Sequence, residues 1–151
     1  MSNPADLYDA ILTGNAKKAE EVTKAALAAD VDPSELLGKY MIPAMDEVGK
    51  RFECNEYFVP ELLIAARAMK TALQLLTPKL AAAGAKAAGR VVIGTVKGDL
   101  HDIGKNLVAM MIEGGGFQVV DLGVDVPAQK FVDAAKEQSG SIVAMSALLT
   151  T

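Results

Sequence analysis

Residues 90–104, Arg90-Val-Val-Ile-Gly-Thr-Val-Lys-Gly-Asp-Leu-His-Asp-Ile-Gly104, join a run of apolar residues to a polar loop. The apolar part, 91–96, is continuous rather than alternating, which is typical of a strand buried on both faces of a parallel sheet. Apolar residues at helical spacing follow over 104–113, and Gly114-Gly-Gly116 ends that segment. These residues therefore predict a strand, a loop and a helix, in that order.

The rest of the carboxyl-terminal half repeats this alternation. We expect a second strand at 117–121, a second helix at 128–138 and a third strand at 141–145. Strands and helices alternating at this spacing indicate right-handed crossovers and a doubly wound parallel sheet. In such a sheet the loops after the strands share one edge, where ligands bind. The loops expected at that edge are 99–104, 123–127 and 146–151.

The amino-terminal half has helical periodicity throughout, and its short connections predict a four-helix bundle. Asp32-Pro-Ser-Glu35 combines an N-cap acceptor with a proline at the first helical position, so it should start the third helix. The fourth helix should begin at Val59-Pro-Glu61, and Pro78 should kink or end it. The apolar face expected for the third helix is Leu37, Tyr40, Met41, Met45, Val48 and Phe52.

A run rich in alanine and glycine, residues 81–89, separates the two patterns. We interpret residues 83–89 as a flexible linker between a helical domain, 1–82, and an α/β domain, 90–151. The alternative for the first half of this run is a tail of the fourth helix, because alanine favours helix.

Composition excludes several classes of protein. With 51% hydrophobic residues the chain can bury a core, and disorder is not expected. A net charge of −4 and scattered basic residues argue against a nucleic-acid surface. The sequence has no leader pattern and no apolar run long enough for a membrane helix, so we expect no membrane and a cytoplasmic location. The single cysteine, Cys54, agrees with a reducing compartment.

His101 is the only histidine in the chain, so it cannot belong to a site with several histidines. If it binds a metal, another group must supply most of the ligands, which indicates a metal held in an organic macrocycle. When one ring nitrogen binds a metal, a carboxylate that accepts from the N–H of the other nitrogen fixes the tautomer. Asp99 could reach that other nitrogen. Gly104 would let the backbone pass close to a flat ligand. From the residues alone, a solvated loop histidine remains the alternative.

The chain resembles the corrinoid proteins of methyl-transfer systems and the cobalamin-binding region of methionine synthase. That family joins a four-helix cap to a Rossmann-like, flavodoxin-like cobalamin domain and carries Asp-x-His-x-x-Gly, followed by Ser-x-Leu. Asp99, His101 and Gly104 fit the first motif, and Ser146 and Leu148 fit the second. The longer strings 98–106 and 57–62 are also similar to the family.

The resemblance implies a corrinoid methyl carrier with cobalamin as its cofactor. His101 would be the lower axial ligand of cobalt, in place of the cofactor's own base. Asp99 would orient His101, and Ser146 would extend this relay. The other residues that the resemblance places at the cofactor are Asp102, Ile103 and Gly104 in the motif, Leu148, Thr150 and Thr151 along the nucleotide tail, and Phe58, Val59 and Leu62 in the cap, where Phe52 is a further candidate. For each cap residue, packing in the bundle core is the alternative.

The resemblance also implies partners. These are a substrate:corrinoid methyltransferase, a second methyltransferase that passes the methyl group to a folate or a thiol, and a reductive activator. Two other functions stay open: a cobalamin-dependent sensor that regulates a partner, and an α/β scaffold without a corrinoid. The sequence does not specify the methyl donor or the oligomeric state.

The family continues beyond Ser-x-Leu with further strands and a Gly-Gly motif that closes the nucleotide-tail pocket. The sequence stops at Thr151, after the third expected strand. Because three strands alone would expose an apolar edge, we expect either a piece of a longer protein or a sheet that another chain completes.

Overall fold

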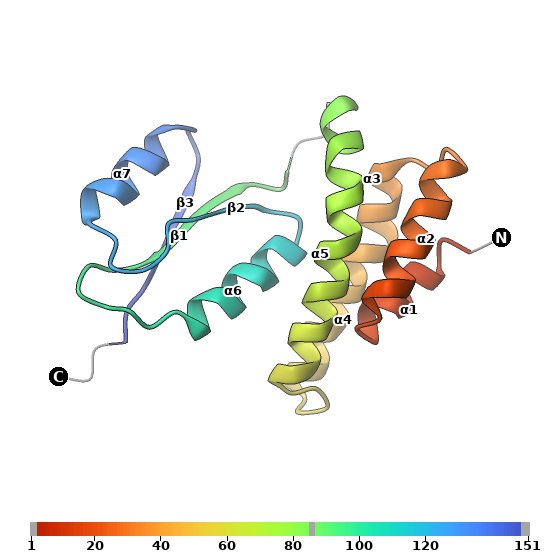
Figure 1. Ribbon diagram of the computed structural model, residues 1–151, viewed down its shortest axis with the longest axis horizontal. Helices are drawn as coiled ribbons and strands as arrows, with labels where there is room; N and C mark the ends of the chain where they lie inside the picture. The colour runs from red at the N-terminus through yellow and green to blue at the C-terminus, as the bar shows by residue number, and fades with distance from the viewer. Residues whose placement is uncertain (1–2, 85–86, 149–151) are drawn as a thin grey trace. The chain divides into compact units, whose positions relative to one another are not determined.

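The computed structural model describes residues 3–84 and 87–148, and the chain divides into two compact units, Met1–Lys86 and Ala87–Thr151. The first unit is helical and the second combines a sheet with helices (Figure 1). This order of a helical cap followed by a Rossmann-like α/β part is the predicted fold class, which is confirmed. The helical unit contains α1 (Asp6–Leu12), α2 (Ala16–Ala28), α3 (Pro33–Glu35), the π-helix η1 (Leu36–Met41), α4 (Ile42–Glu53) and α5 (Val59–Ala82).

The helical unit is held together by an apolar core. The Asn15 side chain caps α2 by accepting a hydrogen bond from the Lys18 N–H at 3.0 Å. Helices α2 and α5 pack on each other, with α1 and α4 against them. Leu7, Ile11, Val22, Val48, Met69 and Leu76 are among the fully buried side chains of this unit.

The third predicted helix is not a regular α-helix. It begins as expected at Pro33, with the Asp32 carboxylate accepting from the Ser34 N–H at 2.9 Å. It then widens into η1 before α4 begins. Pro43, at the start of α4, has no N–H to donate, and its ring occupies the place of an ordinary helical hydrogen bond to the preceding turn. A π-turn accommodates this break without ending the helical run.

The widened turn changes which side chains are buried. Leu36 and Met41, separated by one π-turn, are fully buried. Leu37 and Tyr40 are only half-buried, although the spacing predicted them for the buried face. Phe52 was also predicted there and is exposed, because it lies in the last turn of α4 beyond the core.

Helix α5 runs past Pro78 to Ala82, so the proline does not end it. The Glu61 carboxylate accepts from the Phe58 N–H at 2.9 Å and fixes the start of the helix at the predicted place. Gly84, beyond the helix, has a left-handed φ of 70°.

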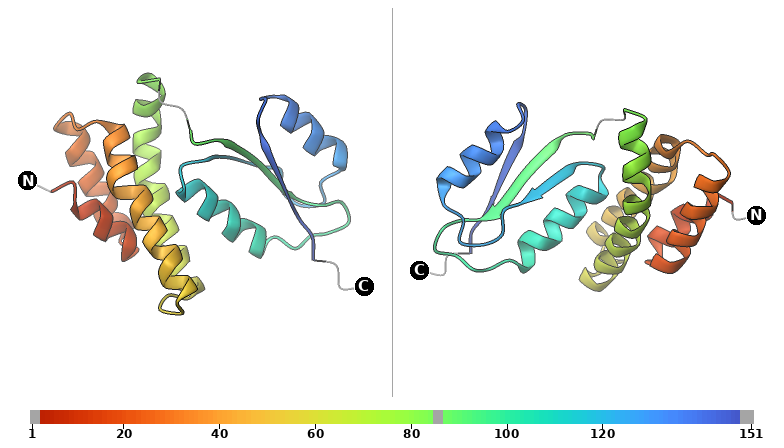
Figure 2. Two further views of the ribbon diagram at one scale, coloured as in Figure 1. Left: turned by 180° about the vertical axis from the view of Figure 1, so that it is seen from behind. Right: turned by 45° about the horizontal axis from the view of Figure 1, so that its top comes forward.

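The second unit is built on a three-stranded parallel sheet with strand order β2-β1-β3. Val92 in the central strand pairs with Val120 on one side and Val143 on the other. Helices α6 and α7 lie on opposite faces of the sheet (Figure 2). The connections from β1 to β2 and from β2 to β3 run in opposite directions across the sheet, so right-handed crossovers place their helices on opposite faces. The elements are β1 (Arg90–Thr95), α6 (Ile103–Gly114), β2 (Gln118–Asp121), α7 (Ala128–Lys136) and β3 (Ile142–Ser146).

Burial in the sheet follows strand position. All residues of β1 are buried, as the continuous apolar run predicted. Val92 packs with Val126, Phe131 and Ala134 in the core of this unit. Strand β3 lies at the sheet's edge and exposes Ile142, Val143 and Met145, so the expected apolar edge is present.

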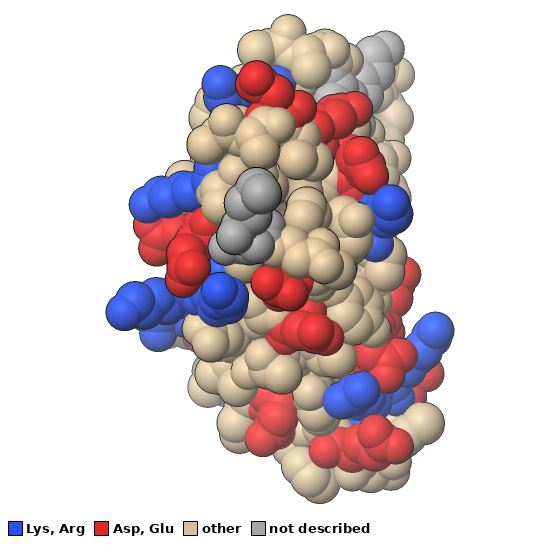
Figure 3. All heavy atoms as spheres, turned by 90° about the vertical axis from the view of Figure 1, so that its right-hand side faces the viewer, with Lys and Arg blue, Asp and Glu red and all other residues tan. Residues whose placement is uncertain are grey.

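Charged side chains of both signs are mixed on the face shown in Figure 3. Surface ion pairs such as Lys18–Glu21 and Lys39–Glu35 join neighbouring turns of the helices. Among the described residues, every helix is too short or too polar to cross a membrane.

Candidate functional site

The loop after β1 folds back onto the end of its own strand. Gly98 adopts a left-handed φ of 86°, and the Asp99 N–H donates to the Val96 carbonyl at 3.1 Å, which closes a tight turn. The Thr95 hydroxyl, fully buried, donates to the His101 carbonyl at 2.9 Å. These bonds place the Asp99 side chain inside the loop and the His101 side chain outside it.

Asp99 and His101 form the predicted pair. Asp99 is only 3% exposed, and its Oδ1 lies 2.9 Å from the His101 backbone N and 2.7 Å from His101 Nδ1. Its Oδ2 accepts from the Leu148 N–H at 2.6 Å. The Leu148 N–H, and then the two groups of His101, lower the pKa of Asp99 to about 2. The carboxylate is therefore ionised at neutral pH and acts only as a hydrogen-bond acceptor.

An ionised acceptor on Nδ1 fixes the tautomer of His101. The ring proton lies on Nδ1, so the lone pair of the neutral imidazole lies on Nε2. The side chain of His101 is 61% exposed. Among the described residues, no group of three or more His, Cys, Asp and Glu side chains could hold a metal ion. His101 can thus offer one nitrogen ligand to a metal whose other ligands come from elsewhere.

Exposed apolar side chains belong to residues next to His101 in its loop and to the residue that binds Asp99. Leu100 and Ile103 flank His101 in the sequence, and Ile103 is 86% exposed at the first position of α6. Leu148, whose N–H binds Asp99, is also exposed. A side chain built at Gly104 would meet no atom within 4 Å, so the surface beside the histidine is open. One metal-binding nitrogen within an open apolar surface fits a broad, flat macrocycle that carries its own metal.

The other predicted site residues have different positions. Asp102 caps α6, where its carbonyl and carboxylate accept from the N–H and side-chain amide of Asn106 at 2.8 and 3.1 Å. The Ser146 carbonyl accepts from the Val96 N–H at 3.0 Å. Within the described part of the chain, no hydrogen bond joins the Ser146 hydroxyl to Asp99 or His101. Thr150 and Thr151 lie outside the described residues.

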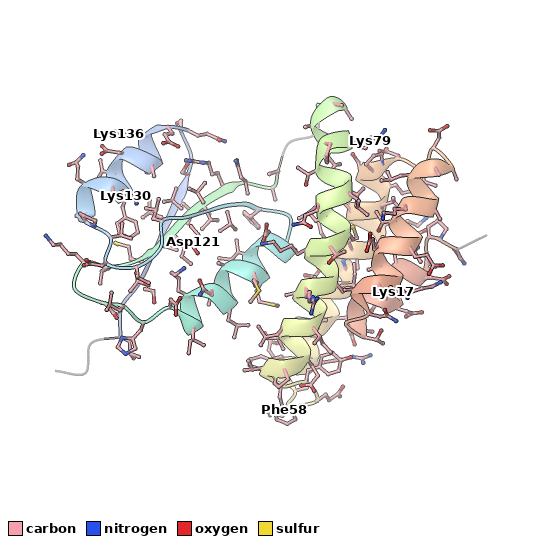
Figure 4. The ribbon with its side chains drawn as sticks, viewed as in Figure 1. Lys17, Phe58, Lys79, Asp121, Lys130 and Lys136 are labelled. Carbon is pink, nitrogen blue, oxygen red and sulfur yellow. The ribbon has the colours of Figure 1, made fainter. Side chains whose placement is uncertain are left out.

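The cap candidates divide into two groups. Phe58 is 60% exposed where α4 passes into α5, and Val59 beside it is also exposed (Figure 4). Leu62 is 3% exposed, because one turn further along α5 it faces the bundle core. Leu62 therefore packs in the bundle core, which was the alternative for each cap residue, and does not share the exposed position of Phe58 and Val59.

Three interactions around the site were not predicted from the sequence. The Leu148 N–H binds Asp99, and Asp125 contacts the same loop through its N–H and its carboxylate. Lys105, buried in the first turn of α6, forms an ion pair with Asp121 at 2.6 Å. Figure 4 shows Asp121 in the sheet-containing unit. An aspartate between Gly123 and Pro127 is typical of a turn, so the sequence indicated that Asp125 shapes this loop but not which groups it contacts.

Known proteins match both units. Residues 5–77 and residues 89–151 match two family models, each described as a B12 binding domain. The chain is 47% identical to trimethylamine corrinoid protein 1 of Methanosarcina acetivorans over 149 residues, which cover 97% of this chain and 69% of the relative. It belongs to the family of B12-binding corrinoid proteins. The predicted family and the cobalamin cofactor are thereby confirmed.

Solved structures of the corrinoid family share the fold. A chain in the crystal structure of the methanol:cobalamin methyltransferase complex of Methanosarcina barkeri has a TM-score of 0.86 and 31% identity, over 95% of this chain and 55% of that chain. A cobalamin-binding protein of Desulfitobacterium hafniense has a TM-score of 0.73 and 36% identity, over 99% and 71%. This chain therefore spans only about half the length of the first of these relatives.

Proposed function

We propose that this chain is a methyl-carrying corrinoid protein in which His101 is the lower axial ligand of cobalt, with the cofactor's own base displaced. One observation carries the proposal: the buried, ionised Asp99 holds the proton on Nδ1 and leaves Nε2 of an exposed imidazole free to bind a metal. When bound, the corrinoid supplies the cobalt that accepts and releases the methyl group.

The chain's own residues set the axial ligand. Asp99 keeps its negative charge through the N–H groups of Leu148 and His101, and that charge makes the imidazole a stronger donor. Thr95 fixes the backbone of the histidine. We propose that Ser146, at the end of β3, extends this relay. The residues proposed to contact the corrinoid are Asp102, Ile103, Gly104 and Leu148, with Thr150 and Thr151 along the nucleotide tail.

The helical unit is proposed to act as a lid over the upper face of the corrin. Phe58 and Val59 are suitable for this role, because they expose apolar surface at one end of the bundle. The proposed division is a cap at 1–82, a hinge at 83–89 and a cofactor domain at 90–151. A lid of this kind would open to admit a partner enzyme.

The proposed partners are two methyltransferases and a reductive activator. The first methyltransferase would load the methyl group, and the second would pass it to a folate or a thiol. Similarity to a trimethylamine corrinoid protein is higher, at 47% identity, than to a chain of a methanol:cobalamin methyltransferase complex, at 31%. We therefore propose a methylamine as the methyl donor.

The ligand role is tested by electron paramagnetic resonance of the chain reconstituted with hydroxocobalamin and reduced to cobalt(II). Axial coordination by nitrogen-14 splits the signal into triplets, whereas nitrogen-15 gives doublets. Protein labelled with nitrogen-15 and loaded with unlabelled cofactor should give doublets, and His101→Ala should lose them. Triplets in the labelled protein would mean that the cofactor's own base is still bound, and the proposal would be wrong.

The carrier role is tested with a purified trimethylamine:corrinoid methyltransferase. We expect the loaded chain, once a strong chemical reductant has brought its cobalt to cobalt(I), to be methylated when that enzyme and trimethylamine are both present. Methylation by a methanol enzyme alone would contradict the proposed donor, and methylation by neither enzyme would contradict the carrier role.

A further inference from the structure

Asp125, in the loop between β2 and α7, contacts the histidine loop at two points. Its carboxylate Oδ1 accepts from the Gly98 N–H at 2.8 Å. Its own N–H donates to the Asp99 carbonyl at 3.0 Å. The backbone of Asp99 is thus fixed by Asp125, while its carboxylate is fixed by His101 and Leu148. Two peptide units that decide the direction of the Asp99 side chain depend on a residue from another loop.

The conformation of Asp125 makes both contacts possible. Its φ of 52° is left-handed, a region that glycine, asparagine and aspartate tolerate and most other residues avoid. The next residue, Val126, is buried, pairs with Val96 and donates to the Thr95 carbonyl at 2.9 Å. Asp125 therefore lies where its loop is joined to the end of β1.

We infer that Asp125 is a positioning residue for His101: by holding the Gly98 and Asp99 peptide units, it sets the place of the Asp99 carboxylate and hence the tautomer of the imidazole. The consequence for cofactor binding rests on the proposed function, in which His101 binds cobalt. The positioning itself does not, because the hydrogen bonds exist in the chain alone.

Three substitutions separate the contributions of this residue. Asp125→Asn keeps an acceptor for the Gly98 N–H and tolerates the left-handed conformation. Asp125→Gly keeps the conformation but removes the acceptor. Asp125→Ala loses the acceptor and strains the backbone. If the hydrogen bond from the Gly98 N–H positions the loop, Asp125→Asn should have the same His101 tautomer as wild type, and Asp125→Gly should not.

The primary measurement is nitrogen-15 NMR of the cofactor-free full chain, labelled at histidine and held at about pH 9, where an ordinary imidazole is neutral. Because the chain has one histidine, the two ring nitrogens give unambiguous signals. We expect the Nδ1–H form in wild type and Asp125→Asn. In Asp125→Gly the shifts should move toward the tautomer mixture of a free imidazole, with far-UV circular dichroism confirming a folded chain.

Two further results bear on the same inference. Reconstitution of Asp125→Gly with hydroxocobalamin should show affinity lower by about 10-fold, the low end of the usual effect of removing a hydrogen-bond partner of a metal ligand.

In wild type, the Gly98 amide should exchange slowly with deuterium, and this measurement does not depend on any variant folding. Fast exchange there, a wild-type tautomer in folded Asp125→Gly, or loss of that tautomer in Asp125→Asn would each overturn the inference.

The outcomes also separate this inference from the proposed function. If His101→Ala bound cobalamin as tightly as wild type, the ligand role would fail, yet the tautomer measurements would still test Asp125. An unchanged tautomer in Asp125→Gly would remove the positioning role alone.

Discussion

The Asp99 carboxylate accepts hydrogen bonds from two parts of the chain, and this makes its contribution to stability depend on pH. Its pKa is about 2 in the folded chain, while an unfolded aspartate has about 3.9. A lowered pKa stabilises the native state fully above the unfolded value, and this stabilisation is lost as the pH falls through the folded value.

We therefore expect Asp99→Asn to change the acid side of the stability profile. Wild type should lose stability between about pH 5 and pH 2, as Asp99 takes up a proton on unfolding. Asp99→Asn has no proton to gain at this position, so its free energy of unfolding should fall less steeply over the same range. Urea unfolding at a series of pH values measures both slopes, and equal slopes would contradict the assignment.

Thr95 offers a second test at the residue scale. Thr95→Val removes the donor to the His101 carbonyl with little change of shape, and we expect a loss of about 1 kcal/mol in the free energy of unfolding. Thr23 is a matched control: it is equally buried, but its hydroxyl donates at 2.7 Å to Ala19, a carbonyl already within helix α2. Thr23→Val should cost almost nothing by urea unfolding, and equal losses would count against the role of Thr95.

The predictable part of the site consists of side chains with distinctive chemistry. A lone histidine two residues after an aspartate, in a loop after a buried strand, indicated that Asp99 could reach the imidazole, and the resemblance to corrinoid proteins implied the Asp99–His101 pair. The Leu148 N–H, 49 residues away from Asp99, could not be predicted in the same way. Main-chain donors occur at every residue except proline, so only the folded loop shows which one is used.

Among the secondary-structure elements, α6 and β2 are joined by an ion pair between a buried lysine and a partly exposed aspartate. Lys105 is almost fully buried and lies 2.6 Å from Asp121 and 2.7 Å from the Asn106 side-chain oxygen. Burial raises the pKa of Asp121, but the combined effect of Lys105 and the Gly123 N–H is larger and opposite, so the pKa is lowered overall. Asp121 also holds the start of the loop that contains Asp125.

The two partners should differ in their cost of removal. Asp121→Ala leaves a buried ammonium without its counter-ion and should cost about 3 kcal/mol of unfolding free energy. Lys105→Met leaves a carboxylate that is 40% exposed and can be solvated, so it should cost about 1 kcal/mol. The double variant should be more stable than Asp121→Ala alone, measured by urea unfolding in a double-mutant cycle. A larger loss for Lys105→Met than for Asp121→Ala would show that the buried ammonium of Lys105 does not depend on Asp121 as its counter-ion.

The helices show where periodicity stops being informative. The capping pattern at Asp32–Glu35 placed the start of the third helix correctly, but the spacing of three and four residues assumed one uniform helix to Phe52. Pro43 interrupts the hydrogen-bond ladder, and the π-turn before it buries Leu36 in place of Leu37 and Tyr40, while Met41 is buried as predicted. The sequence contains the proline, but either a bend or a wider turn can accommodate it, and packing decides between them.

At the scale of the whole molecule, two units with separate cores make up the chain. The helical unit buries long side chains such as Leu7, Ile11 and Met69, whereas the α/β unit has a smaller core around Val92 and Phe131. Strand β3 leaves apolar side chains exposed at the sheet's edge. We therefore expect the α/β unit to be the less stable of the two without cofactor.

The three tyrosines, Tyr8, Tyr40 and Tyr57, all lie in the helical unit, and the chain has no tryptophan. Tyrosine fluorescence thus follows the unfolding of that unit alone, while deuterium exchange of the β1 amides follows the other. In urea without cofactor, β1 should lose protection before the fluorescence changes. Coincident transitions would show that the units unfold together.

Hydroxocobalamin should change this order, because a ligand that binds only the folded state stabilises it by an amount that grows with the logarithm of its concentration. At a free concentration about 100-fold above its dissociation constant, the β1 transition should gain about 2.7 kcal/mol. His101→Ala should gain less at the same concentration, because the axial bond contributes to affinity. An equal gain in both proteins would mean that the corrinoid is held by the apolar surface around Ile103 and Leu148, and that the histidine adds nothing to its binding.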